Sequence, residues 1–166
     1  MLTESSFVDL CDSTVRAFPN CRFRQHATQP VKISQIAWTP FIGMKTLFVK
    51  AIAQNEGKEY NLIILFKGVR YQNINENAVT IKANDGKNYF LKQLSTNTND
   101  ILIRCSCKDH MFRFNYYNYL DHSLHGRKRK KYEGQGLWKA NPLKLPGLCK
   151  HLIKFMEVLS NSKIIK

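Results

Sequence analysis

Two short motifs that lie far apart in the sequence carry metal-ligating side chains. Cys105 and Cys107 form a Cys-x-Cys motif, and Cys149 and His151 form a Cys-x-His motif. Three thiolates and one imidazole complete a tetrahedral shell of the kind that holds structural zinc. Such a closed shell leaves no position for a catalytic water. The sequence therefore predicts a structural metal site with these four ligands and zinc as the metal.

Each motif must lie at the end of an element for the ligands to converge. Residues 101–105 are rich in β-branched side chains and predict a strand, in which residues two apart point to the same face. Within a regular helix, residues two apart diverge by about 200°. Cys149 and His151 can nevertheless converge if Cys149 lies in the turn that begins the helix predicted for residues 148–160. A helix N-terminus also favours thiolate, the ligating form.

Other ligand sets and another metal stay open. His110 would make a more local site if it replaced His151, and an iron–sulfur cluster is the second cofactor hypothesis. Cys11 is expected to be a buried thiol on a helix, and Cys21 with His26 forms a looser pair. Five cysteines without a secretory signal argue against a disulfide framework. Unliganded buried thiols are the remaining alternative.

The paired motifs resemble the SWIM-type zinc finger, whose signature is Cys-x-Cys followed by Cys-x-His. Phe112 after the first pair, and the apolar helix that opens at the second pair, extend the resemblance. The family implies a strand-turn-strand and a helix held by zinc, used to bind DNA or protein. The connector between the pairs, residues 108–148, is 41 residues long, which is longer than the family usually has.

A looser resemblance covers residues 101–160 as a whole. It is carried by Tyr-Leu at 119–120, Gly-Arg-Lys at 126–128, Asn-Pro at 141–142 and Pro-Gly-Leu-Cys-Lys-His-Leu at 146–152. These segments are similar to parts of small, uncharacterised zinc-binding proteins encoded by tailed bacteriophages. The resemblance implies a minor structural component of a phage particle, with other virion or assembly proteins as its partners.

Positive charge is concentrated in the C-terminal part of the chain. Residues 1–100 carry 12 Lys/Arg against 8 Asp/Glu, whereas residues 101–166 carry 14 against 4. Five cations are contiguous: Arg127, Lys128, Arg129, Lys130 and Lys131. They predict phosphate contacts with DNA or RNA that carry no base specificity. An acidic protein partner or a solvated surface would also account for them.

Residues 112–119 are dense in aromatic side chains. Such rings can stack on the bases of a nucleic acid. Most of them are instead expected to pack as core around the metal site and the final helix, which need apolar partners.

The predicted elements give an α+β fold with an antiparallel sheet, an N-terminal helix and a C-terminal helix pinned to the last strand by zinc. The N-terminal helix is predicted over residues 4–18. Strands are predicted over 31–38, 46–53, 60–69, 78–82, 89–94 and 101–105. Short connections favour antiparallel pairing, and Asn-Asp-Gly-Lys at 84–87 predicts a hairpin. Residues 1–100 are expected to hold the helix and sheet, and residues 101–166 the zinc-binding module, in one compact unit.

No catalytic pattern accompanies these motifs. The sequence has no Gly-rich phosphate loop, nucleophile elbow or His-Glu-x-x-His. It also lacks a bilayer-spanning apolar run, and its first residues lack the regions of a secretory signal. We therefore expect a protein of a virion or host cytoplasm, not secreted, with neither a membrane nor a small-molecule substrate as partner. The prediction is a non-enzymatic, zinc-stapled assembly protein, with nucleic-acid binding as the alternative.

Overall fold

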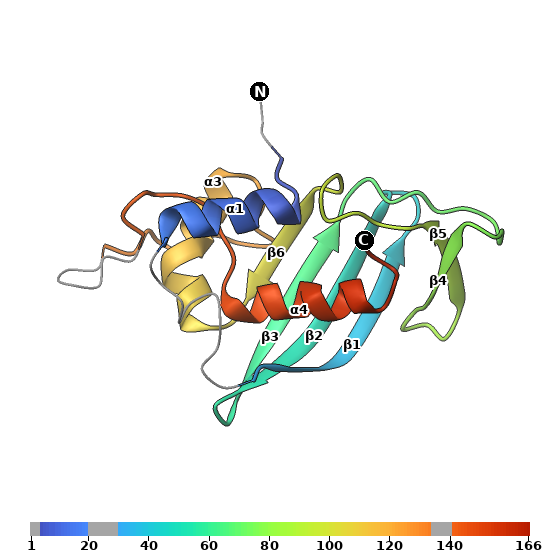
Figure 1. The fold of residues 1–166 in the computed structure, drawn as a ribbon, viewed down its shortest axis with the longest axis horizontal. Coiled ribbons are helices and arrows are strands. Elements are labelled where there is room, and N and C mark those ends of the chain that lie inside the picture. Colours follow the sequence, from blue (N-terminus) through green and yellow to red (C-terminus); the bar gives the residue numbers. More distant parts are fainter. Residues whose placement is uncertain (1–3, 20–29, 134–140) are drawn as a thin grey trace.

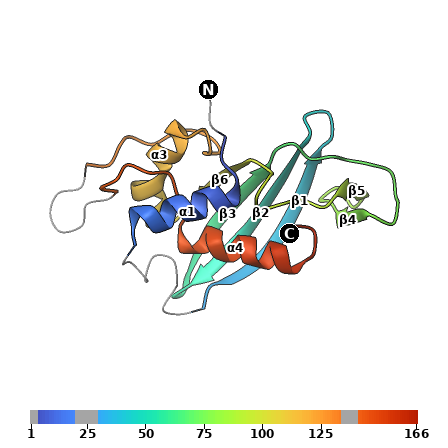
Figure 2. The ribbon, with the colours of Figure 1, turned by 45° about the horizontal axis from the view of Figure 1, so that its top comes forward.

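A four-stranded antiparallel sheet organises the computed structural model, which describes residues 4–19, 30–133 and 141–166. The strands follow the order β1-β2-β3-β6, with bounds β1 (Lys32–Phe41), β2 (Thr46–Asn55), β3 (Lys58–Phe66) and β6 (Ile101–Cys105). Helix α4 (Lys150–Asn161) lies across one face of this sheet, and α1 (Phe7–Ala17) lies beside α4 (Figures 1 and 2). The predicted α+β class, with its N-terminal helix, antiparallel strands and C-terminal helix, is confirmed.

Tight turns explain the antiparallel pairing. Glu56 and Gly57, between β2 and β3, both have positive φ angles, 54° and 71°, as a two-residue hairpin turn requires. The predicted hairpin at 84–87 joins β4 (Ala78–Lys82) to β5 (Asn88–Lys92). These two strands form a separate sheet at the right-hand end of Figure 1. Because β4 and β5 do not join the four-stranded sheet, β6 pairs directly with β3.

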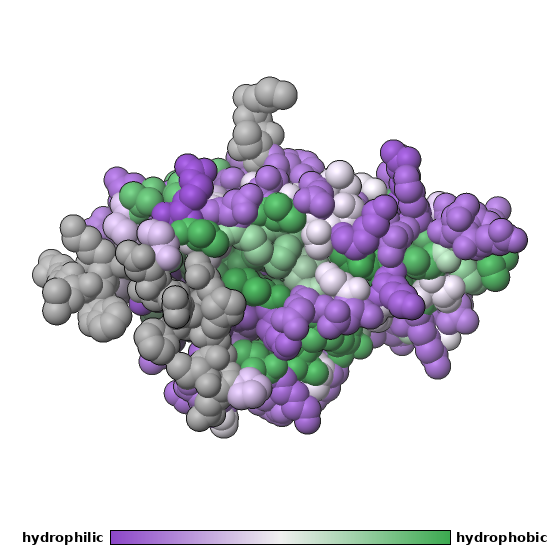
Figure 3. All heavy atoms as spheres, viewed as in Figure 1, coloured by the Kyte–Doolittle hydropathy of each residue, from purple (hydrophilic) through white to green (hydrophobic). Residues whose placement is uncertain are grey.

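The sheet face beneath α4 is apolar. Side chains alternate between the two faces along each strand, and the residues that point to this face are apolar. Its buried residues are Leu47, Val49, Ala51 and Ala53 on β2, Leu62, Ile64 and Phe66 on β3, and Ile101, Ile103 and Cys105 on β6. Helix α4 contributes Leu152, Phe155, Met156 and Leu159. Burial of one large apolar side chain stabilises the fold by about 1.5–3 kcal/mol, so this face holds α4 against the sheet. The outward side of α4 carries hydrophilic residues with apolar residues beside them (Figure 3).

Helix α1 begins later than predicted, because the residues before it form its cap. The Ser6 hydroxyl accepts a hydrogen bond from the backbone N–H of Asp9, and the Asp9 carboxylate accepts one from the N–H of Ser6. This reciprocal capping box satisfies two otherwise unpaired N–H groups. No helix in the described ranges has both the length and the apolar character needed to span a bilayer.

The segment after β6 is helical, which was not predicted. It consists of η1 (His110–Phe114), a turn of π-helix, and α3 (Asn115–Leu120). The prediction that most of its aromatic residues pack as core is wrong. Phe114 is buried and packs edge-on against Phe18 at 5.7 Å between ring centroids, but Phe112 and Tyr119 are 38% and 43% exposed. This short helical pair has one buried side and one aromatic surface.

Candidate metal centre

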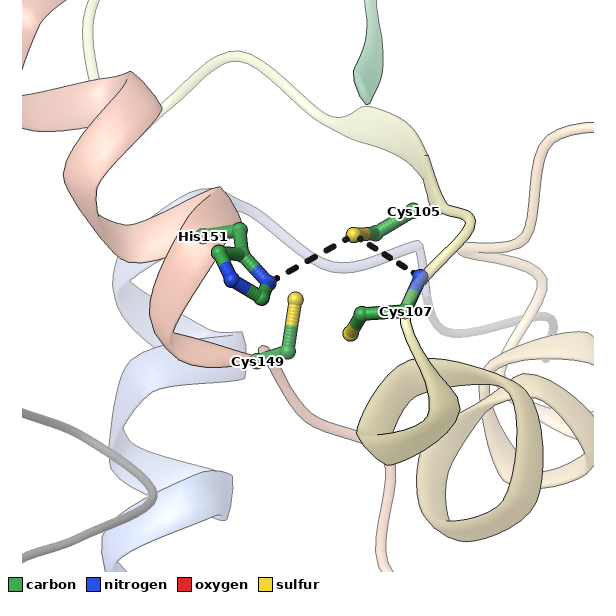
Figure 4. Close-up of side chains that lie close together, drawn as sticks. All are labelled: Cys105, Cys107, Cys149 and His151. Carbon is green, nitrogen blue, oxygen red and sulfur yellow. Dashed lines mark hydrogen bonds between the residues drawn. The ribbon is translucent and has the colours of Figure 1, made fainter. Parts of the chain in front are cut away.

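The structure brings Cys105, Cys107, Cys149 and His151 together where β6 ends and α4 begins (Figure 4). All four residues are buried, and one ligand atom from each lies within 4.8 Å of the other three. Nδ1 of His151 is 3.9 Å from Sγ of Cys105. With Zn–S about 2.3 Å and Zn–N about 2.0 Å, tetrahedral zinc places its ligand atoms roughly 3.5–3.8 Å apart. The cluster is therefore positioned to bind a metal, and a contraction of the ligand-atom separations by about 1 Å would complete a tetrahedral shell.

The end of β6 presents the first two sulfurs. Cys105 is the last residue of the strand, paired with Leu62 of β3. The pairing continues one residue further, because Ser106 N–H donates to the carbonyl of Asn61 at 3.1 Å and the Ser106 hydroxyl accepts from the N–H of Asn61 at 2.9 Å. This continued pairing keeps the side chains of Cys105 and Cys107 on one side, as predicted for strand-like spacing.

The start of α4 presents the other two ligands. Cys149 is the N-cap residue, with extended backbone angles (φ −78°, ψ 162°), and His151 lies in the first turn. The non-helical backbone at Cys149 lets the two side chains converge instead of diverging as they would inside a helix. The partial positive charge of the helix N-terminus also favours a thiolate at this position.

Backbone N–H groups point at two of the sulfurs. The N–H of Cys107 donates to Sγ of Cys105 at 3.4 Å, and the N–H of His110 donates to Sγ of Cys107 at 3.3 Å. Hydrogen bonds from the neighbouring thiols of Cys105 and Cys149 hold the pKa of Cys107 far below its usual range. Burial raises the pKa of both Cys105 and Cys149. Three buried sulfurs close together carry their full negative charge only when a cation compensates it.

The ring of His151 is covered by Tyr60, with 4.4 Å between ring centroids. Its Nδ1 faces the sulfurs, whereas its Nε2 is buried and has no hydrogen-bond partner among the residues described. A neutral imidazole that uses Nδ1 as a ligand carries its proton on Nε2. The Tyr60 ring excludes water from this side of the cluster.

Hydrogen bonds from α1 and α3 fix the two residues that precede Cys149. Asn118 donates from Nδ2 to the carbonyl of Gly147 at 3.0 Å, and its Oδ1 accepts from the Gly147 N–H at 2.8 Å. The Thr14 hydroxyl accepts from the N–H of Leu148 at 2.8 Å. Sequence patterns missed Asn118 and Thr14, because neither is near Cys149 in the chain. These residues set the position from which α4 starts.

Only glycine fits at position 147, because the side chains of Phe114 and Thr14 lie too close to its Cα to leave room for a Cβ. A Cβ at this position would lie 2.6 Å from a ring carbon of Phe114 and 2.6 Å from Oγ1 of Thr14. Such distances are too short for nonbonded carbon and oxygen atoms in a packed interior. Any larger residue would displace the segment that leads into Cys149.

The alternative ligands differ in their placement. The ligand cluster within the described residues contains His151 and not His110. His110 is fully buried, and burial lowers its pKa to about 4. Cys11 lies on α1 outside the cluster, and burial raises its pKa to about 11. Cys21 and His26 lie outside the described residues.

No family model, curated protein or solved structure matches the chain. The four residues form a candidate metal centre. Their geometry is compatible with a zinc finger and with zinc as the metal. The SWIM type and the phage origin stay predictions.

Proposed function

We propose that the protein is a non-enzymatic assembly protein whose C-terminal part is stapled by one structural zinc ion. The closed set of four buried ligand atoms carries this proposal. A catalytic zinc keeps one coordination position open to water or substrate, whereas four protein ligands fill a tetrahedral shell. Buried ligands from a strand end and a helix start link elements that are far apart in the chain.

The spacing of the ligand atoms supports a single ion over an iron–sulfur cluster. Atoms within 4.8 Å of one another can all reach one central ion. A cluster places several iron and sulfide atoms between its ligands, which holds those ligands further apart. Zinc accepts a mixture of sulfur and nitrogen ligands without redox chemistry.

Elemental analysis of the purified full-length protein tests the metal assignment. We expect one zinc per chain in the unmodified protein and in Cys11→Ser, which alters a thiol outside the cluster. We expect a large loss of zinc in Cys149→Ser, because serine is a poor zinc ligand. Iron with acid-labile sulfide would support a cluster instead, and a metal-free, folded protein would contradict the proposal.

An assembly role, as a minor component of a tailed phage particle, is supported by resemblance and by an exposed apolar surface. Phe41, Ile42 and Met44, at the β1–β2 connection, are 43%, 54% and 76% exposed. Adjacent exposed apolar side chains of this size are typical of protein contact sites. Other virion or assembly proteins are the partners that this role requires.

Sedimentation with virions tests the assembly role. The protein is expected to remain with washed particles at a fixed stoichiometry. Met44→Lys is expected to reduce that association, because it places a charge in the apolar surface. Lys87→Met, in the exposed β4–β5 turn, is the control that changes charge elsewhere. Absence of the unmodified protein from washed particles would contradict this role.

Binding of nucleic acid is a second candidate function, favoured by the placement of the five contiguous cations. Residues 127–131 are all exposed. Between residues 127 and 133 the sequence contains a single acidic residue, Glu133. A segment of this charge attracts phosphate groups, with affinity that falls steeply as salt rises.

A further inference from the structure

Exposed aromatic rings lie beside the cationic segment. The basic–aromatic surface comprises Phe112, Tyr116, Tyr119, Lys128, Arg129 and Tyr132. Phe112, Tyr119 and Tyr132 are 38%, 43% and 49% exposed. These rings come from η1, from α3 and from the chain that follows them, and no single helix face explains their proximity. The surface therefore depends on the tertiary fold.

Cations and rings are in direct contact across this surface. Nζ of Lys128 is 4.7 Å from the ring centroid of Tyr119 and 6.0 Å from that of Tyr116. The guanidinium carbon of Arg129 is 5.8 Å from the centroid of Phe112. Cation–π contacts of this kind orient long side chains that would otherwise move freely. The positive charges are thus held next to aromatic faces.

The backbone that carries the cations is anchored to the body of the protein. Nη1 of Arg104 donates to the carbonyl of His125 at 2.9 Å and to that of Arg127 at 3.0 Å. The N–H of Arg129 donates to Oδ1 of Asn115 at 2.8 Å. Residues 123–125 also pair with β6, through bonds to Ile103 in both directions. An anchored segment loses less conformational entropy when a ligand binds.

We infer that the basic–aromatic surface binds single-stranded nucleic acid, with bases stacked on its exposed rings and phosphates paired with its cations. This inference rests on the second candidate function and adds the form of the nucleic acid. Every base has an aromatic face, so stacking and phosphate contacts give affinity without base specificity. In a duplex the base faces are covered by neighbouring pairs, and exposed rings cannot reach them.

The distance between two rings indicates where a base stacks. Phe112 and Tyr132 are 5.1 Å apart between centroids, with ring planes inclined by 46°. A base inserted between two rings needs roughly 7 Å, two stacking separations. The bases therefore stack on the outward faces of the rings, where the side chains are exposed. An acidic protein segment would pair with the same cations but would gain little from these faces.

Fluorescence anisotropy with the full-length protein tests the inference. The probes are a labelled oligothymidylate and a labelled DNA duplex with the same number of phosphates. We expect the single strand to bind more tightly than the duplex. Tyr119→Leu and Tyr132→Leu should each weaken single-strand binding about fivefold or more and weaken duplex binding by a clearly smaller factor. Tyr89→Leu is the control, because it makes the same substitution at a partly exposed tyrosine on β5, in the separate two-stranded sheet.

A second pair of substitutions separates charge from stacking. Lys128→Gln with Arg129→Gln should weaken the binding of both probes. It should also lower the salt slope for the single strand by about 1.4, since each phosphate contact contributes about 0.7. Equal binding of both probes, with the aromatic variants unaffected, would overturn the single-strand inference and leave phosphate binding intact. Polyglutamate competing as well as unlabelled oligothymidylate would overturn it in favour of an acidic protein partner. Absence of binding at low salt would remove both the inference and the second candidate function.

Discussion

Cys149→Ser is expected to abolish cooperative folding of the C-terminal part of the protein. Binding of a structural zinc contributes on the order of 10 kcal/mol in small zinc modules, and most of that energy is folding energy. A domain of ordinary size has a net stability of about 5–15 kcal/mol. Loss of the ion therefore removes a large fraction of the stability that holds α4 on the sheet. Circular dichroism during thermal unfolding, and hydrogen exchange of the α4 amides, measure the effect.

Cys11→Ser is the control for this substitution. It makes the same chemical change at a partly buried thiol that lies outside the ligand cluster. We expect it to shift the thermal midpoint by a few degrees at most, which corresponds to roughly 1 kcal/mol or less. Excess chelator should lower the thermal midpoint of the unmodified protein and of Cys11→Ser. It should not lower the midpoint of Cys149→Ser any further. Equal destabilisation by the two serine variants would contradict a metal at the cluster.

The parts of the site that sequence could predict are those fixed by local backbone geometry. Strand spacing places Cys105 and Cys107 on one side, and the start of a helix lets Cys149 and His151 converge. Both effects act within three residues, so residue type and spacing reveal them. The hairpin at 84–87 was predictable for the same reason, because its turn residues determine the turn.

The parts that sequence could not predict depend on contacts between distant residues. Asn and aromatic residues are poor helix formers, so local propensity gave no indication of η1 and α3. Burial of Phe114 against Phe18, and of Asn118 against Gly147, stabilises these short helices from outside. Core packing was favoured over exposure for the rings on their other side, because apolar side chains of a folded domain are more often buried. The pairing of β6 with β3 across an intervening hairpin is likewise non-local.

Asn118→Leu is expected to destabilise the protein by about 2–6 kcal/mol, although leucine has nearly the shape of asparagine. Asn118 is fully buried, and its amide pairs with both backbone groups of Gly147. Leucine would leave a buried N–H and a buried carbonyl without partners, each at a cost of about 1–3 kcal/mol. Urea unfolding of the metal-loaded protein measures the loss. Asn73→Leu, at an exposed position, is the control and should change the free energy of unfolding by less than about 0.5 kcal/mol.

The same substitution should also weaken metal binding, and this separates a positioning role from a purely structural one. Gly147 lies two residues before Cys149. The Asn118 amide therefore helps to fix the backbone position from which the Cys149 side chain extends to the other three ligands. Residues that orient metal ligands from a distance typically change affinity by about 10- to 100-fold. Competition with a chromophoric zinc chelator, under conditions where the variant is fully folded, should show a loss in that range. Wild-type zinc affinity in a destabilised Asn118→Leu protein would mean that the amide supports the fold without positioning Cys149.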